Sequence, residues 1–183
     1  MDGIVRRLLV LTAFLVTGTR LAVAAPESRP VSAEQRLKEL HIELPEPPEP
    51  FGMYVEAVQT GDLLFLSGML PTEGRTVKYV GRVGGELDVA AGRKAARLAT
   101  MNGLAVVRKQ LGSLDRVARV VRIGVSVATS GDVRDQPKVA DGASELLQEV
   151  FGKERNPSRL VFGVASLPLG APVEVELIFQ VAR

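Results

Sequence analysis

The sequence predicts an α+β fold in which a mixed β-sheet packs two helices against one of its faces. Two observations predict this class. Several short segments alternate apolar and polar residues, and two longer segments carry apolar residues at helical spacing. Their order is hairpin, helix, strand, helix, strand, strand, which favours a mixed sheet with both helices on one side. The 183 residues, 46% of them hydrophobic, suffice for one core.

The first sheet elements are two strands at residues 55–58 and 63–67. Thr60-Gly61-Asp62 lies between them and suits a tight turn, so we expect a β-hairpin. Residues 74–85 are rich in glycine and other turn-forming residues, and they include the apolar pair Tyr79-Val80. We expect a long excursion there, with room for a short strand.

Two helices are expected, over residues 89–111 and 137–151. Asp88 can cap the first helix, and Gly112 can end it. The buried stripe of this helix is mostly alanine and leucine, which allows its backbone to lie close to a sheet. Pro137 suits the first turn of the second helix, which stops at Gly152.

Three further strands are expected, at residues 117–128, 159–165 and 173–182. In the first of them the residues expected to point inward are Val121, Ile123, Val125 and Val127. In the last strand, valine, leucine and phenylalanine alternate with Glu174, Glu176, Ile178 and Gln180. Because the helices cover one face, we expect the other face to be a subunit interface.

The N-terminal residues predict a targeting segment. Arg6-Arg7, a short apolar run and Ala22-Val23-Ala24 predict a secretory signal peptide over residues 1–25. We therefore expect export to the periplasm, or a cytoplasmic protein if the segment is not cleaved. Residues 26–52 read as an extended, proline-rich lead-in that includes a short helix capped by Ser32. The domain proper is assigned to residues 53–183.

Composition excludes several classes of chemistry. Cysteine is absent and His41 is the sole histidine, so thiol nucleophiles, disulfides and zinc clusters lack their essential residues. His41 lies in a polar segment, where a solvated side chain is expected rather than a general base. Without residues 1–24, Lys+Arg falls from 23 to 20 and Asp+Glu from 21 to 20. The remainder is formally neutral, so nucleic acid is not the expected partner. No membrane span is expected in the mature chain.

Two charged residues stand out because they lie in apolar strands. Arg159 opens the strand Leu160–Ala165, and Glu174 lies within Val173-Glu174-Val175-Glu176. A charge in such a strand must be paired, exposed at an end or functional. If these two strands pair antiparallel across residues 166–172, a structural ion pair explains both residues. Otherwise both are candidates for a functional site.

Short motifs along the chain carry a family resemblance. They are Gly52-Met53-Tyr54, Leu66-Ser67-Gly68-Met69-Leu70-Pro71, Pro157-Ser158-Arg159, Val164-Ala165-Ser166-Leu167-Pro168 and Val173-Glu174-Val175-Glu176. In this order and spacing, from about residue 37 to residue 183, the chain resembles the RidA/YjgF family. The resemblance implies a chorismate-mutase-like fold and a homotrimer with clefts between its subunits.

The resemblance also implies an activity. Characterised members of the family hydrolyse reactive enamines and imines to 2-oxo acids and ammonia, without a cofactor or metal. By the matching motifs, Arg159 binds the substrate carboxylate and Glu174 positions or deprotonates the attacking water. Tyr54 and Gly68 match positions that line the family's cleft. Tyr54 is equally well explained as a rim aromatic residue.

Some positions depart from the family pattern. The segment from Thr72 to Asp88 is longer than in compact members, and Leu160 and Val161 stand where the family carries cysteine or serine. A polar residue that the family places in the loop before the second helix has no secure match. Its candidates are Gln136, Asp141 and Ser144, and none is assigned.

Two other functions stay open at this point. One is a non-catalytic trimer that binds a small carboxylate at the Arg159 cleft. The other is the endoribonuclease activity ascribed to some relatives. The neutral charge of the mature chain and its 4% aromatic content oppose the second, because RNA-binding grooves are basic and stack bases on aromatic rings.

Overall fold

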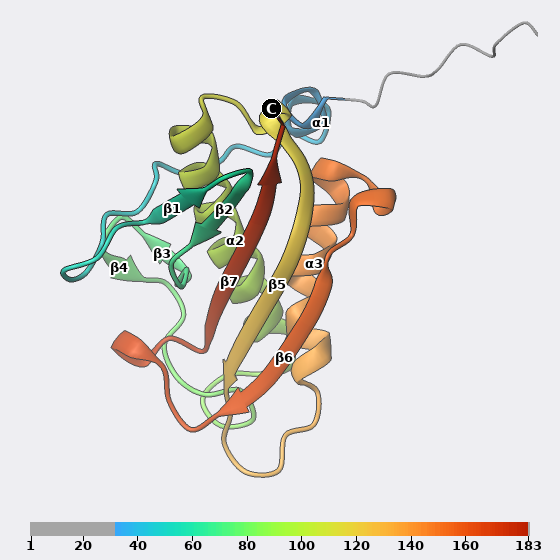
Figure 1. Ribbon diagram of the computed structural model, residues 1–183. Coiled ribbons are helices and arrows are strands. Elements are labelled where there is room, and N and C mark those ends of the chain that lie inside the picture. The colour runs from blue at the N-terminus through green and yellow to red at the C-terminus, as the bar shows by residue number, and fades with distance from the viewer. Residues whose placement is uncertain (1–31, 183) are drawn as a thin grey trace, which may run out of the picture. The chain divides into compact units, whose positions relative to one another are not determined.

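The computed structural model describes residues 32–182. The predicted signal peptide, residues 1–25, and the first residues of the predicted lead-in lie outside this range. Residues 32–182 have the predicted α+β architecture, a five-stranded mixed sheet with α2 (Val89–Leu111) and α3 (Gln136–Phe151) side by side against one face (Figure 1). The short helix α1 (Ala33–Glu39) packs against α3.

The sheet has the strand order β1-β2-β7-β5-β6, with β5 and β6 parallel and the other neighbours antiparallel. Its strands are β1 (Ala57–Thr60), β2 (Leu63–Leu66), β5 (Val117–Ala128), β6 (Ser158–Val164) and β7 (Val173–Val181). β1 and β2 form the predicted hairpin, and Gly61 in its turn has a φ of 58°, a value that glycine adopts without steric cost.

The excursion after the hairpin contains a separate small ladder. It is formed by β3 (Thr72–Glu73) and β4 (Thr76–Val77). The short strand for which the sequence left room therefore lies just before the apolar pair Tyr79-Val80.

The strands that carry Arg159 and Glu174 are not neighbours. β5 lies between them, parallel to β6 and antiparallel to β7. The crossover through α3 brings β6 parallel to β5, and β7 then pairs with the other side of β5. The connection between β6 and β7 includes the short 3-10 helix η3 (Pro168–Gly170). The structural Arg159–Glu174 ion pair considered from the sequence is therefore wrong.

The predicted caps delimit both long helices. Asp88 Oδ1 accepts a hydrogen bond of 2.7 Å from the Ala91 amide at the start of α2. Gly112 ends that helix in the left-handed region, at φ 80°. Pro137 lies in the first turn of α3, and Gly152 ends α3 at φ 89°.

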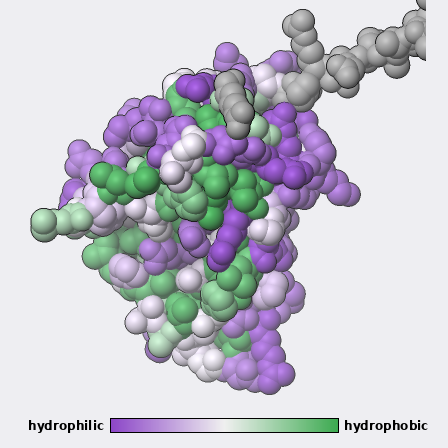
Figure 2. Space-filling view, in the orientation of Figure 1, coloured by the Kyte–Doolittle hydropathy of each residue, from purple (hydrophilic) through white to green (hydrophobic). Residues whose placement is uncertain are grey.

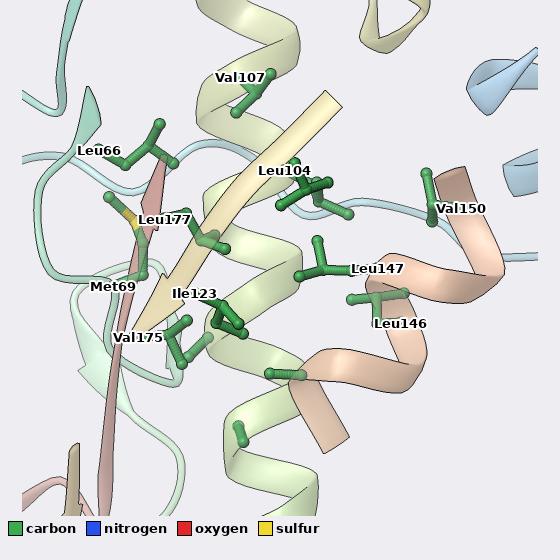
Figure 3. Packing of buried hydrophobic residues seen from close by; sticks show 14 of the residues in the cluster. Leu66, Met69, Leu104, Val107, Ile123, Leu146, Leu147, Val150, Val175 and Leu177 are labelled. Atoms are coloured by element: carbon green, nitrogen blue, oxygen red, sulfur yellow. The ribbon is translucent and has the colours of Figure 1, made fainter. Parts of the chain in front are cut away.

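A single apolar core lies between the helices and the sheet (Figure 3). α2 and α3 contribute Leu104 and Leu147, and the sheet contributes Ile123 and Leu177. Each of these side chains is at most 1% exposed. Removal of this apolar surface from water is the main force that holds the two layers together.

One departure of β5 from strict alternation lies at residues 120–122. Ile123 and Val125 point into the core as predicted, but Val121 is half-buried and Val120 is buried in its place. The register between β5 and β7 shifts between Val120 and Arg122. Such a β-bulge adds a residue to one strand and so reverses the inward and outward positions that precede it.

The described part of the predicted lead-in packs on the domain. Ser32 caps α1 through a hydrogen bond of 3.1 Å from the Gln35 amide, as predicted. Leu37 is 2% exposed within the common core, and Glu34 forms an ion pair of 2.7 Å with Arg108 of α2. Residues 42–50 form neither helix nor strand. Within residues 32–182, no helix combines the length and apolar character that a membrane crossing requires.

The second face of the sheet carries no helix among the described residues (Figure 1). It presents Glu174, Glu176 and Ile178 of β7, as the alternation of that strand predicts. Figure 2 shows hydrophobic residues gathered over this face, with hydrophilic residues between them. Exposed apolar side chains on it are Val58, Phe65, Leu160 and Phe162.

Candidate functional site

A mostly apolar cavity brings together three of the predicted site residues. Tyr54, Gly68 and Glu174 all line it, and its volume is about 480 Å³. Its walls come from the proline-rich segment 48–52, from residues 67–72 after β2, and from Leu169 in η3. Sites for small molecules are typically cavities of this kind, mostly apolar with a few polar groups.

Glu174 is a half-buried carboxylic acid in the wall of this cavity. It lies at the start of β7 on the sheet face that has no helix, opposite Ser126 of β5. Burial removes water from the carboxylate and raises its pKa above the ordinary value of 4.5. A carboxyl group of this kind takes up and releases a proton closer to neutral pH than an exposed glutamate does, which suits a general base.

Gly68 lies directly against the Glu174 carboxylate. Met69 and Val175 exchange backbone hydrogen bonds of 2.8 and 2.9 Å, so the chain before Met69 runs closely alongside the start of β7. A Cβ atom at position 68 would overlap the Glu174 carboxylate oxygen. A side chain at position 68 would therefore displace the Glu174 carboxylate, so glycine suits this close approach, as the family motif implies.

Tyr54 lies at the rim of the cavity. Its side chain is exposed, and its hydroxyl accepts a hydrogen bond of 3.1 Å from the Phe51 amide. The phenol thus orders the turn that follows the proline-rich segment, and its own O–H points to no acceptor among residues 32–182. Both sequence-based interpretations of Tyr54, a cleft residue and a rim aromatic, agree with this position.

Asn102 is a residue of the site that the sequence reasoning did not single out. It is 1% exposed within α2, and its Nδ2 donates to the Leu70 and Thr72 carbonyls at 2.9 and 3.0 Å. These bonds fix the segment that carries Gly68. The signal was present, since Asn102 is an amide among the mostly apolar residues of a helical stripe.

Arg159 lies away from this cavity. It lies on β6 opposite Ile123 of β5, and its side chain lies on the helix side of the sheet. Its Nη1 donates to Asp141 Oδ1 at 2.7 Å and to Ser144 Oγ at 3.1 Å, both on α3. Its Nε and Nη2 donate to no acceptor within residues 32–182. Because the side chain is 31% exposed, these N–H groups are available to a carboxylate.

The candidates for the unassigned polar residue have different surroundings. Asp141 and Ser144 contact Arg159 from within α3, not from the loop before it. Gln136, the first residue of α3, donates instead to the Val133 carbonyl. The structure thus groups Asp141 and Ser144 with Arg159 and leaves Gln136 outside that group.

The remaining sequence candidates do not form a reactive centre. Leu160 lies on the face without helices, and Val161 packs toward the core. His41 is exposed and does not line the cavity of Glu174. Among residues 32–182, no three His, Asp or Glu side chains are close enough to hold a metal ion.

One chain therefore carries two separate groups of site residues. The first group is Tyr54, Gly68 and Glu174 around the cavity, and the second is Arg159 with Asp141 and Ser144. The two groups lie on opposite faces of the sheet, because Glu174 faces away from the helices and Arg159 faces α3.

Known proteins resemble this chain over most of its length. A family model described as "YjgF/chorismate_mutase-like, putative endoribonuclease" matches residues 34–181. Protein TCP17 of Trypanosoma cruzi is 39% identical over 145 residues, 79% of this chain and 91% of that protein. A 2-iminobutanoate/2-iminopropanoate deaminase of Dermatophagoides farinae is 32% identical over 137 residues, 75% of this chain and 92% of that protein.

Solved structures agree with this assignment. The crystal structure of Atu1372 from Agrobacterium tumefaciens, a protein of unknown function, has a TM-score of 0.74 and 37% sequence identity. The match covers 82% of this chain and 92% of that chain. The matched family model, the two relatives and the five-stranded sheet with its paired helices show that this chain belongs to the YjgF/RidA family.

Proposed function

We propose that this protein hydrolyses reactive 2-enamino and 2-imino acids to 2-oxo acids and ammonia. The observation that carries the proposal is the half-buried Glu174 carboxylate, which lies against Gly68 in a mostly apolar cavity of about 480 Å³. The relative named as a 2-iminobutanoate/2-iminopropanoate deaminase supports the substrate class.

The chemistry assigns distinct roles to Arg159 and Glu174. Arg159 binds the substrate carboxylate through Nε–H and Nη2–H, a bidentate geometry that lysine does not reproduce. Glu174 accepts a proton from water as the water oxygen bonds to the imine carbon. The resulting tetrahedral intermediate expels ammonia after proton transfer to nitrogen, and the carbonyl of the 2-oxo acid forms. General base catalysis of this type contributes roughly 10² to 10⁴ in rate.

The separation of Arg159 from Glu174 leads to an oligomeric site. Since these residues lie on opposite faces of one sheet, a single chain does not present both to one small substrate. We propose that the protein is a homotrimer in which Arg159 of one subunit faces the Glu174 cavity of the next. The apolar face without helices, with Phe65, Leu160 and Phe162 exposed, supplies a contact surface.

Trapping of an unstable imine tests the activity. An amino-acid oxidase generates the 2-imino acid, and semicarbazide traps whatever has not been hydrolysed. Wild-type protein should lower semicarbazone formation in proportion to its concentration, whereas Arg159→Ala and Glu174→Gln variants should not. Semicarbazone formation unaffected by wild-type protein would show that the protein is not a deaminase of these substrates.

Binding measurements separate the non-catalytic alternative. A protein that binds 2-oxobutanoate in calorimetry, loses this binding in Arg159→Ala and does not accelerate imine decay is a carboxylate-binding trimer. In that case Arg159 keeps its role and the one proposed for Glu174 is wrong.

A further inference from the structure

Asp141 makes the Arg159 site different from a simple binding site for a carboxylate. Its Oδ1 accepts a hydrogen bond of 2.7 Å from Arg159 Nη1, and Ser144 Oγ accepts a second from the same nitrogen at 3.1 Å. The two charged side chains are 31% and 40% exposed. A ligand that reaches the guanidinium therefore meets a negative charge beside the positive one.

We propose that Asp141 is a specificity-determining residue that selects ligands carrying a cationic nitrogen next to their carboxylate. Such ligands are the iminium form of a 2-imino acid and the ammonium form of an amino acid. The inference rests on the proposed function and extends it, because it names the charge state that the site recognises and a residue outside the family motifs that recognises it.

The hydrogen-bonding capacity of the pair supports this selection. Arg159 Nε and Nη2 are available to a ligand carboxylate, and Asp141 Oδ2 accepts no hydrogen bond from residues 32–182. A zwitterion matches both groups, with its carboxylate on the guanidinium and its N–H on Oδ2. A 2-oxo acid instead brings a carbonyl oxygen and a net negative charge to Asp141, an unfavourable arrangement in a partly desolvated site.

This selection also affects turnover. The iminium substrate carries the positive charge that Asp141 favours, and the 2-oxo acid product has lost it. Binding is therefore stronger before hydrolysis than after it, so the product leaves readily and inhibits weakly.

Two ligands with the same carbon skeleton test the inference. 2-Aminobutanoate carries an ammonium group where 2-hydroxybutanoate carries a hydroxyl group. Calorimetry measures the binding of each. Wild-type protein should bind 2-aminobutanoate about tenfold more tightly, the effect expected for one charge-assisted hydrogen bond. The isosteric Asp141→Asn variant, which keeps an acceptor for Arg159, should abolish or invert this ratio.

Glu145→Gln is the matched control. Glu145 lies one turn further along α3 and pairs with Arg93, so the variant removes the same charge from the same helix without contacting Arg159. It should keep the wild-type ratio of affinities. Equal affinities of wild-type protein for the two ligands would overturn the inference, and so would equal losses of affinity for both ligands in Asp141→Asn. The comparison of the two ligands on wild-type protein tests the inference even if the variant does not fold.

The trapping assay distinguishes this failure from that of the proposed function. If wild-type protein hydrolyses the imine but binds the two ligands equally well, only the role of Asp141 is wrong and the proposed function stands. If wild-type protein neither binds the two ligands nor hydrolyses the imine, both the inference and the proposed function are wrong.

Discussion

At the scale of the residue, a carboxylate and a guanidinium acquire different properties from their surroundings. Glu174 lies in an apolar cavity without a cationic partner among residues 32–182, so burial raises its pKa. Arg159 has a carboxylate partner and a hydroxyl partner, yet its Nε–H and Nη2–H donate to no acceptor among residues 32–182. These surroundings suit the roles proposed for the two residues, proton transfer for Glu174 and anion binding for Arg159.

The raised pKa of Glu174 predicts how stability depends on pH. Between the unfolded pKa near 4.5 and the higher folded pKa, the folded state binds more protons than the unfolded state. The free energy of unfolding therefore falls as pH rises through this window. Glu174→Gln removes this term, so it should be more stable than wild type at pH 7 and lose that advantage below about pH 4.

Urea unfolding at fixed protein concentration, at pH 4 and pH 7, measures the effect. Glu176→Gln, an exposed carboxylate on the same strand, controls for the loss of one negative charge. An advantage of Glu174→Gln that is the same at both pH values would contradict the assignment of a raised pKa to the half-buried Glu174 carboxyl group. The same shift predicts that imine hydrolysis increases as pH rises through the folded pKa, because the base must be deprotonated.

At the scale of the element, α2 does more than cover the sheet. Its small residues allow close packing, and Asn102 reaches out of the helix to hold the segment after β2 that forms one wall of the cavity. A helix that packs on the sheet therefore also positions Gly68 against Glu174.

The role of Asn102 predicts a linked loss of stability and activity. Asn102→Ala removes the side-chain donor to the Leu70 and Thr72 carbonyls, although the Leu70 carbonyl still accepts from the Thr72 amide. The loss should cost about 1 to 3 kcal/mol. Thr100→Val is the control, because the Thr100 hydroxyl bonds within α2 to the Ala96 carbonyl. Urea unfolding and imine trapping should show both losses in Asn102→Ala and smaller changes in Thr100→Val. Equal effects of the two substitutions would show that Asn102 does not specifically support the site.

At the scale of the whole molecule, the apolar face without helices and the divided site point to the same assembly. Phe65, Leu160 and Phe162 lie exposed on that face, and exposed apolar surface of this kind is typical of subunit interfaces. Under the proposed function, the groups around Glu174 and Arg159 would meet on one substrate only in an assembly of two or more copies.

A charge on the apolar face should prevent assembly. Phe162→Asp places a carboxylate where the side chain is 54% exposed in one subunit, and its burial between subunits would be unfavourable by several kcal/mol, on the order of the cost of an unpaired buried charge. Sedimentation should show a trimer for wild type and monomer for Phe162→Asp. Leu40→Asp, an exposed leucine just after α1, should remain a trimer. Assembly of Phe162→Asp like wild type would place the interface elsewhere.

Mixed trimers test the divided site directly. Arg159→Ala and Glu174→Gln are each expected to be inactive, but a site that takes Arg159 from one chain and Glu174 from another is intact in a mixture. Random assembly of equal amounts restores about a quarter of the sites. Imine trapping after co-refolding measures this recovery. Its absence, with trimers formed, would indicate that both residues act within one chain.

The sequence by itself determined the helices, the hairpin, the caps and the residues of the family motifs, because periodicity, glycine and capping chemistry act over a few neighbouring positions. It did not determine which face of β6 carries Arg159, since Leu160 to Val164 are apolar or small on both faces and their alternation holds no information. The tertiary structure decided this through the pairing of β6 with β5, which turns Arg159 toward Asp141 and away from Glu174. It also decided the bulge in β5 and the contact of Asn102 with the segment after β2, because strand register and long-range hydrogen bonds depend on residues far apart in the chain.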